Sequence, residues 1–363
     1  MQSLLLFVAG LTGLILGAEL LVRGASKLAL SFGISPLVVG LTIVAFGTSS
    51  PELAVSVGAV LDGRTDIAIG NVVGSNVFNV LLILGLSALI TPLVVDSQLI
   101  RQEVPIMLGA SLLLLVLALD QRLSAIDGAM LFALMLAYTF FLVRQSRAAT
   151  RATAAAGTDA GAPAPAPTAR NGWDDRLPVQ IALIVFGLAA LVLGSNALVS
   201  AAVDFAKALG VSDLVIGLTI IAAGTSMPEV AASLTAALKG QRDIAVGNVI
   251  GSNVFNILGC LGLSSLISGA AGLTVPAAVL NFDIWVMLAA TLACLPVFLS
   301  GRCIARWEGL LFVAYYAAYV AYLILAASQH DALPAYSTVM LGFALPLTMV
   351  TLVVAVLRPA RSP

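Results

Sequence analysis

Long apolar runs, separated by short polar segments, recur along almost the whole chain. A helix needs about 20 mostly apolar residues to cross the hydrocarbon core of a bilayer. By this measure the pattern predicts eleven membrane-spanning helices, near 3–22, 36–60, 66–91, 104–119, 124–143, 178–202, 212–237, 243–269, 281–299, 306–328 and 336–357. We therefore expect an all-α polytopic membrane protein that is surrounded by the lipid bilayer.

One polar segment is much longer than the others. Residues 145–177 contain Ala-Pro repeats at 162–167 and scattered arginines, which predict a flexible cytoplasmic linker without a folded domain. The linker separates a first unit of five helices, 1–144, from a second unit of five helices, 178–328. Residues 329–363 are expected to add an extra C-terminal helix and a tail.

Composition supports the membrane assignment. Of the 363 residues, 60% are hydrophobic and only 10% are charged, whereas a soluble domain carries about 25% charged residues. The net charge of −1 gives no sign of nucleic-acid binding. The three cysteines show no metal-ligand spacing, so no cofactor is expected, and no obligate protein partner is evident.

The placement of basic residues predicts the orientation. With the N-terminus outside and eleven crossings, 14 of the 17 lysines and arginines fall on the inner side, and only Arg64, Arg122 and Lys207 fall outside. Cytoplasmic segments of membrane proteins carry such an excess. We expect a cytoplasmic C-terminus and a location in a bacterial inner membrane.

An internal repeat carries most of the functional information. Residues 14–91 align without a gap with residues 191–268, and 45 of the 78 positions are identical. Because each unit has five helices, an odd number, the second copy must enter the membrane from the opposite side. Inverted-topology repeats of this kind are typical of secondary transporters with a site at the bilayer midplane.

The first shared motif places a carboxylate inside an apolar span. Residues 47–52 read Gly-Thr-Ser-Ser-Pro-Glu and residues 224–229 read Gly-Thr-Ser-Met-Pro-Glu. A charged residue at the centre of a membrane helix costs about 2.5–3.5 kcal/mol on insertion scales, so it indicates function. The proline before each glutamate cannot donate to the preceding turn, which leaves carbonyl oxygens for other partners. Two carboxylates and several carbonyls suit a hard divalent cation such as Ca2+.

The second shared motif supplies neutral oxygens. Residues 70–79 read Gly-Asn-Val-Val-Gly-Ser-Asn-Val-Phe-Asn, and residues 247–256 repeat them with one change. The serine and the last asparagine of each motif are four residues apart, on one helix face. Their oxygens suit a monovalent cation such as Na+. The two glycines of each motif predict a close approach between helices.

The two motifs, each present twice, resemble the alpha repeats of the Na+/Ca2+ exchanger family, within the cation/Ca2+ exchanger superfamily, in its prokaryotic type without a regulatory loop domain. The resemblance implies that Glu52 and Glu229 are the central Ca2+ ligands, joined by the backbone carbonyls of Thr48 and Thr225. It also implies a set of residues for Na+ and the central region, namely Ala45, Ser49, Ser75, Asn79, Ala222, Ser226, Ser252 and Asn256. The first and sixth helices are implied to slide against the other helices.

These observations predict a transporter, not an enzyme, that exchanges Na+ for Ca2+ by alternating access. An H+/Ca2+ antiporter is the main alternative, because a proton can also neutralise a buried glutamate. A K+-dependent exchanger is disfavoured because some such relatives carry aspartate at the position of Asn256. A cation channel is disfavoured by the inverted repeat. An intramembrane serine protease would need a base, and the only histidine, His330, lies in a short loop.

Overall fold

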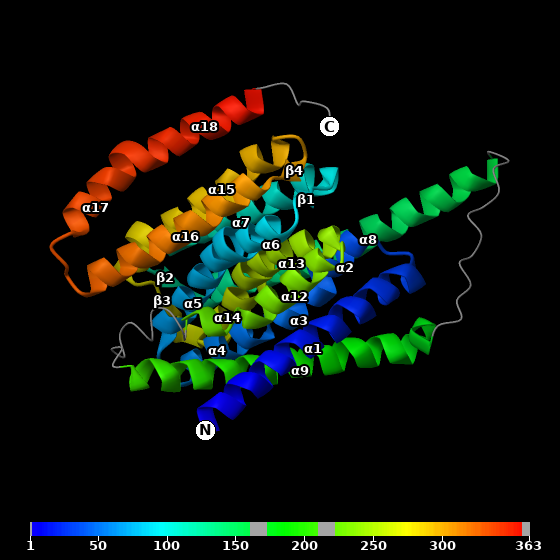
Figure 1. Cartoon of the computed structure of the whole chain (residues 1–363), viewed down its shortest axis with the longest axis horizontal. Helices are drawn as coiled ribbons and strands as arrows, with labels where there is room; N and C mark the ends of the chain where they lie inside the picture. Colours follow the sequence, from blue (N-terminus) through cyan, green and yellow to red (C-terminus); the bar gives the residue numbers. More distant parts are fainter. Residues whose placement is uncertain (1, 160–172, 210–221, 358–363) are drawn as a thin grey trace.

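The computed structural model describes residues 2–159, 173–209 and 222–357. In this part of the chain almost every residue is helical, and two short antiparallel ribbons are the only strands. The helices lie roughly parallel to one another in a single bundle (Figure 1). The structure therefore confirms the predicted all-α polytopic fold.

The first half contains helices that are interrupted at characteristic places. Its α-helices are α1 (Gln2–Phe32), α2 (Pro36–Val39), α3 (Ala45–Thr48), α4 (Ser50–Leu61), α5 (Thr65–Phe78), α6 (Gly85–Ile90), α7 (Val104–Leu117) and α8 (Ala125–Asp159). π-Helical stretches join several of them, at Gly40–Val44, Asn79–Leu84 and Leu99–Glu103. A 3-10 turn at Ala118–Asp120 ends α7.

The second half repeats this order. Its α-helices are α9 (Leu177–Ala208), α11 (Ala222–Gly224), α12 (Met227–Leu238), α13 (Arg242–Phe255), α14 (Gly262–Ile267), α15 (Ile284–Leu299) and α16 (Arg306–Ala327), followed by α17 (Leu333–Val339) and α18 (Leu345–Leu357). π-Helical stretches occur again, at Asn256–Leu261, Val279–Asp283 and Met340–Ala344. Short 3-10 turns lie at Trp173–Asp175 and Gly269–Ala271.

Nine helices in the described residues are long and apolar enough to cross a membrane. A tenth is counted when the pair Pro36–Thr48 and Ser50–Leu61, which is bent by 42°, is taken as one span. The predicted seventh span, 212–237, begins in residues outside the described part, so only its portion from Ala222 onward can be compared. The other predicted spans all have a counterpart among the helices.

Two ribbons tie the halves together. Strand β1 (Leu93–Val94) pairs with β4 (Cys303–Ile304), and β2 (Arg122–Leu123) pairs with β3 (Leu273–Thr274). Each ribbon takes one strand from the first half and one from the second. The two halves are therefore joined by backbone hydrogen bonds as well as by helix packing.

Helices α1 and α9 cross closely at one edge of the bundle (Figure 1). Glycines allow the close approach: a Cβ atom added at Gly17 would lie 2.8 Å from the carbonyl oxygen of Gly187, and one at Gly194 would lie 2.9 Å from that of Gly10. Small residues permit such backbone contact between membrane helices. Helices α1 and α9 are therefore in contact along much of their length.

Polar contacts fasten the same pair at both ends. At one end, Ser3 donates a hydrogen bond to Asp204, with 2.9 Å between the oxygens. At the other end, the Arg23 guanidinium lies 2.8 Å from the Asp174 carboxylate, and the Lys27 ammonium lies 2.8 Å from that of Asp175. Arg23 also stacks on the Trp173 ring, 4.8 Å from its centroid.

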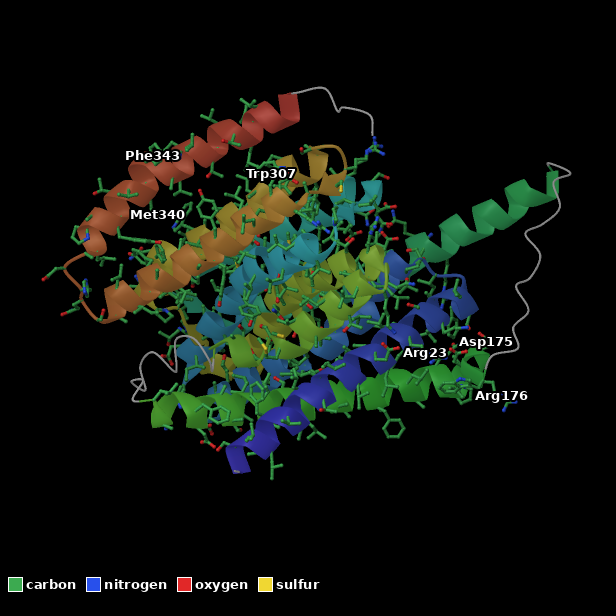
Figure 2. The ribbon with its side chains drawn as sticks, in the orientation of Figure 1. Arg23, Asp175, Arg176, Trp307, Met340 and Phe343 are labelled. Atoms are coloured by element: carbon green, nitrogen blue, oxygen red, sulfur yellow. The ribbon has the colours of Figure 1, made fainter. Side chains whose placement is uncertain are left out.

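The outer surface is apolar, as expected for contact with lipid. Trp307, Met340 and Phe343 project from helices at the edge opposite α1 and α9, whereas Arg23, Asp175 and Arg176 gather near the start of α9 (Figure 2). Helices α17 and α18 form the predicted extra C-terminal segment. They are held in part by Tyr315 of α16, whose hydroxyl donates to the carbonyl of Ala344 at 3.1 Å.

The boundaries of two predicted segments were wrong. Helix α1 continues to Phe32 instead of ending near residue 22. Helix α8 continues to Asp159, beyond the expected boundary at 144, because the alanine-rich stretch after Arg144 favours a helix. The Ala-Pro repeats at 162–167 lie outside the described residues. The predicted 145–177 linker is therefore helical over its first part.

Candidate ion-binding site

Each repeat contains a break in a membrane helix at its first motif. Helix α3 ends at Thr48 and α4 begins at Ser50, with Ser49 between them at φ −82° and ψ 8°. In the second repeat, Ser226 precedes α12 with nearly the same angles, φ −86° and ψ 6°. The proline two residues after each serine lacks an amide hydrogen, which explains why the helix breaks at this turn in both copies.

The two glutamates follow these breaks directly. Glu52 lies in the first turn of α4 and Glu229 in the first turn of α12, and both side chains are completely buried. The N-terminal end of a helix carries a partial positive charge, which favours a carboxylate in the first turn. The chain thus places two acidic groups inside the bundle at positions where the backbone itself stabilises negative charge.

Each carboxylate is bound by a serine from the opposite repeat. The Ser49 hydroxyl donates to Oε1 of Glu229 at 2.9 Å, and the Ser226 hydroxyl donates to Oε1 of Glu52 at 2.8 Å. Ser75 also donates to Oε1 of Glu52, at 3.4 Å, and lies 3.2 Å from the Ser226 hydroxyl. The two halves therefore share one centre, in which the Ser49–Glu229 and Ser226–Glu52 bonds join one repeat to the other.

Four asparagines form a second layer of contacts between the halves. Nδ2 of Asn79 donates to Oδ1 of Asn253 at 3.0 Å, and Nδ2 of Asn256 donates to Oδ1 of Asn76 at 3.1 Å. Both pairs are buried. These bonds fix the orientation of the amide groups of Asn79 and Asn256.

The outer asparagines contact the helix breaks. The Thr48 hydroxyl donates to Oδ1 of Asn248 at 3.1 Å, and the Thr225 hydroxyl donates to Oδ1 of Asn71 at 3.5 Å. Asn71 also donates through Nδ2 to the backbone carbonyl of Glu52 at 3.1 Å. These asparagines connect the second motif of each repeat to the broken turn that carries a glutamate.

A π-helical stretch begins at Asn79 and another at Asn256. Such single-turn widenings of an α-helix are frequent at functional sites. Helix α13, which ends just before the second stretch, also packs tightly: a Cβ atom at Gly251 would lie 2.5 Å from the carbonyl oxygen of Leu41. This confirms the predicted close approach for the second copy of the glycine motif. For Gly70 and Gly74 it stays a prediction, because residues 214–218, the counterparts of Leu37–Leu41, lie outside the described part.

Several buried oxygens of the two motifs have no hydrogen-bond partner among the described residues. They are Oε2 of Glu52, Oε2 of Glu229, Oδ1 of Asn79 and the hydroxyl of Ser252. A buried polar atom without a partner is costly, and carboxylates even more so. All four are hard oxygen donors, and no cluster of three or more His, Cys, Asp or Glu side chains accompanies them in the described chain. This donor set fits hard cations such as Ca2+ or Na+ better than soft transition metals.

The structure thus brings together most of the residues that the motifs single out. Glu52, Glu229, Ser49, Ser226 and Ser75 form one connected centre, and the Ala45 backbone belongs to the adjacent turn. Ser252 is buried but makes no matching contact to Glu229, unlike its counterpart Ser75. The side chain of Ala222 lies outside the described part.

Asn76 and Asn253 were missed by the sequence reasoning. They orient Asn79 and Asn256, as described above, and they precede these residues by three positions. Residues three apart share a helix face, so the spacing could have indicated a common role. The spacing thus indicates a shared helix face, but it does not reveal that each asparagine pairs with one from the other repeat.

Comparison with known proteins identifies the family. The sequence profile of one protein family, described as sodium/calcium exchanger protein, matches residues 2–144 and 179–325. The chain belongs to the sodium/calcium exchanger family. Its two matched segments leave out the linker and the C-terminal helices α17 and α18, and both contain a complete copy of the two motifs. This exchanger is therefore a membrane transporter, not an enzyme.

Individual relatives agree with this assignment. The exchanger is 34% identical over 345 residues to the sodium/calcium exchanger MaX1 of Methanosarcina acetivorans, covering 88% of this chain and 97% of the relative. It is 40% identical over 263 residues to the inner membrane protein YrbG of Escherichia coli, covering 72% and 79%. The solved structure of the sodium-calcium exchanger NCX_Mj matches with a TM-score of 0.74 at 32% identity, covering 89% of this exchanger and 99% of that chain.

Proposed function

We propose that this exchanger moves Ca2+ in one direction and Na+ in the other through the centre built around Glu52 and Glu229. One observation carries the proposal: two completely buried carboxylates, one from each inverted repeat, each accept a hydrogen bond from a serine of the other repeat. Each keeps a second oxygen without a partner in the described residues. A single divalent cation or several monovalent cations can neutralise such a pair.

Competition for the same oxygens explains the coupling. Burial disfavours the charged carboxylates strongly unless a cation is present. If Ca2+ or Na+ occupies the centre, the other cannot, and an empty charged centre is the least favourable state to move through the membrane. Exchange follows from this without any chemical step.

The individual ligand roles belong to the same proposal. Glu52 and Glu229, with the backbone carbonyls of Thr48 and Thr225, would bind Ca2+. Na+ would use the backbone of Ala45 and Ala222 and the serines and asparagines of the motifs. The hydroxyls of Ser49 and Ser226 favour Na+ over H+ as the counter-ion, because a proton on a carboxylate needs no additional oxygen ligands.

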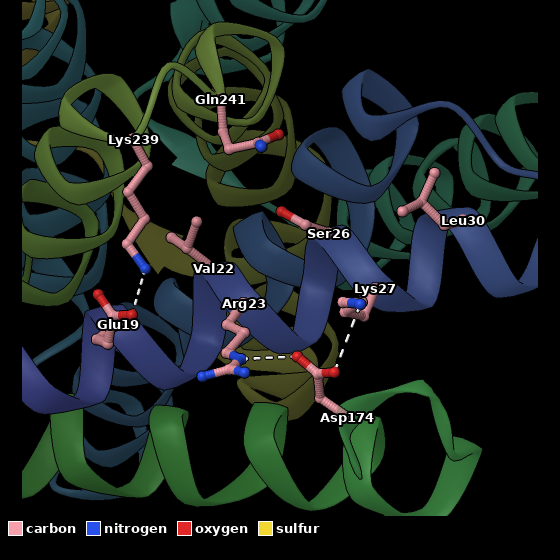
Figure 3. A pocket seen from close by; sticks show the side chains of 9 residues that line it. All are labelled: Glu19, Val22, Arg23, Ser26, Lys27, Leu30, Asp174, Lys239 and Gln241. Carbon is pink, nitrogen blue, oxygen red and sulfur yellow. Dashed lines mark hydrogen bonds and ion pairs between the residues drawn. The ribbon is translucent and has the colours of Figure 1, made fainter. Parts of the chain in front are cut away.

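The position of basic residues supports an orientation. Arg23 and Lys27 line one pocket together with Lys239 (Figure 3), and Arg176 lies near Arg23 (Figure 2). Cytoplasmic ends carry such an excess. We infer that this end is cytoplasmic, with the N-terminus outside, the C-terminus inside, and the protein in a bacterial inner membrane.

The direct test is uptake of radioactive Ca2+ by proteoliposomes that are loaded with Na+ and diluted into Na+-free buffer. Uptake should require the Na+ gradient and should be lost in Glu52→Gln and Glu229→Gln. Ser50→Ala is the matched control, since the Ser50 hydroxyl bonds to the carbonyl of Phe46, outside the proposed site, and is replaced by Met227 in the other repeat. Uptake driven by a pH gradient alone would point to H+ exchange, and uptake without any counter-ion gradient would point to a channel.

A further inference from the structure

A hydroxyl on α9 binds the backbone at the break of the second repeat. The Ser195 hydroxyl donates to the carbonyl oxygen of Gly224 at 2.7 Å, and both residues are buried. In an unbroken helix this carbonyl would accept from the amide four residues later. That residue is Pro228, which has no amide hydrogen. Ser195 therefore satisfies a buried carbonyl that the proline leaves without its usual donor.

The first repeat lacks this contact for a reason visible in the sequence. Gly47 is the counterpart of Gly224, and Pro51 removes the amide that would have bonded to its carbonyl. The counterpart of Ser195 is Ala18, which is completely buried and has no hydroxyl. No side chain at this position of α1 can donate to the Gly47 carbonyl.

The packing around the two glycines is otherwise preserved between repeats. A Cβ atom at Gly224 would lie 2.6 Å from a methyl group of Val199, and one at Gly47 would lie 2.6 Å from a methyl group of Leu188. Both contacts come from α9. The counterparts of these residues on α1 are Val22 and Leu11, which are the same amino acids. In the arrangement where α1 and α9 exchange roles, the apolar contacts can form again, but the hydrogen bond cannot.

A second contact has the same asymmetry. Glu19 of α1 forms an ion pair with Lys239 at the end of α12, beside a cavity of about 370 Å3 that Val22 also lines (Figure 3). The counterparts of Glu19 and Lys239 are Asn196 and Asp62. A neutral asparagine facing an aspartate cannot form an ion pair. These two polar contacts between the α1–α9 pair and the other helices are thus specific to the observed arrangement.

We propose that Ser195 is a positioning residue for the transport cycle, which holds the α1–α9 pair against the ion-binding turn in the observed arrangement and biases the exchanger toward it. The proposal rests on the proposed exchange by alternating access. The reverse arrangement, in which α1 takes the place of α9, makes neither the Ser195 bond nor the Glu19–Lys239 pair. Movement of the pair therefore breaks a buried hydrogen bond without forming an equivalent one.

The test measures the two arrangements directly. Spin labels are attached to cysteines introduced at Asp62, at the end of α4, and Leu209, at the end of α9, in a Cys303→Ser background. Both positions are exposed and lie outside the proposed site. Pulsed EPR distances in proteoliposomes then report the fraction of molecules in each arrangement. Ser195→Ala should raise the minor fraction by about two- to tenfold, as expected for loss of one hydrogen bond.

Two further variants distinguish a positioning role of Ser195 from an effect on the stability of the fold alone. Ser195→Thr keeps the hydroxyl and should leave the distance distribution unchanged. Ala18→Ser supplies the missing counterpart and should raise the minor fraction by a similar factor. A distribution unchanged in Ser195→Ala, with only a lower Tm, would overturn the proposal, as would an equal shift in Ser195→Thr. The measured distances do not depend on which ion is exchanged. If Ser195→Ala shifts the distances but Na+ does not drive Ca2+ uptake, the proposed function is rejected and the positioning role of Ser195 is kept.

Discussion

The hydroxyl of Ser226 lies 2.8 Å from the carboxylate of Glu52, although the two residues belong to opposite repeats. The reciprocal contact, Ser49 to Glu229, is 2.9 Å long. The two bonds are related by the internal symmetry of the chain and have nearly equal lengths. The centre is therefore a joint product of both halves, and changes in either half should have matching effects.

Ser226→Ala and Ser49→Ala should weaken Na+ binding to a similar extent. Each change removes a hydroxyl that contacts a buried carboxylate, and hydrogen bonds to charged groups contribute about 1.5–3 kcal/mol. We expect the Na+ concentration for half-maximal Ca2+ release to rise by about tenfold or more, and the half-maximal Ca2+ concentration to change less. Exchange assays in proteoliposomes measure both. Equal effects on Na+ and Ca2+, or an effect of only one serine, would contradict the shared centre.

Asn253→Leu should destabilise the folded protein through Asn79. The change removes the acceptor of the Asn79 amide, which is buried and would lose its partner. An unsatisfied buried donor costs about 1–3 kcal/mol. Thermal unfolding in detergent should show a lower Tm, and Asn76→Leu should behave alike because it orphans Asn256 in the same way. Asn196→Leu, at an exposed position of α9, is the control and should leave the Tm unchanged.

Gly194→Ala should disrupt the contact between α1 and α9. The new Cβ atom would lie 2.8 Å from the backbone nitrogen of Leu14 and 2.9 Å from the carbonyl oxygen of Gly10, so the two helices must separate. We expect a lower Tm and reduced exchange. Gly109→Ala is the matched control, because no described heavy atom lies within 4 Å of its Cβ position. Alanine is also the better helix former by about 1 kcal/mol, so this control should be neutral or stabilising.

Acid should release the contact between Asp174 and α1 only at low pH. The hydrogen bond from Arg23, supported by the nearby Lys27, holds the pKa of Asp174 below its usual range. A carboxylate whose pKa is lowered on folding stabilises the fold above its unfolded pKa, and this contribution disappears as the pH falls through the lowered value. The contact should therefore persist from neutral pH down to about pH 4, the ordinary range of aspartate.

Trp173 provides the readout for this titration. It stacks with Arg23, and Trp285→Phe with Trp307→Phe would leave it as the sole tryptophan. Its fluorescence should stay constant at higher pH and change only in stronger acid, and Asp174→Asn should remove the transition. A midpoint above about pH 4 would show that the Asp174 carboxylate is not stabilised by Arg23.

The parts of this structure that could be predicted depend on local pattern. The spans follow from hydrophobic runs, and the pairing of Glu52 with Glu229 follows from the fixed offset between the repeats. The sequence did not predict which serine binds which glutamate, because that contact depends on how the two halves face each other. The cross-repeat bond of Ser226 becomes visible only in three dimensions.

Two further differences have physical causes that the hydrophobic pattern does not record. Glu103 stands just before the predicted span 104–119, yet it is completely buried and accepts hydrogen bonds from Tyr138, at 2.7 Å, and from Gln98 and Gln102. One of these donors is a tyrosine thirty-five positions away, which the local pattern does not reveal. The helical continuation of α8 to Asp159 was missed because low hydropathy ends a membrane span without ending a helix.

The crossed serine–glutamate bonds constrain how such a protein could have arisen from a single repeat. One copy alone carries a glutamate whose serine partner sits on another copy facing the opposite way. A five-helix ancestor could have assembled this centre only as an antiparallel pair, with equal numbers of molecules inserted in each direction. A single chain that carries both repeats needs no dual insertion, and its positions 18 and 195 can differ, as they do here.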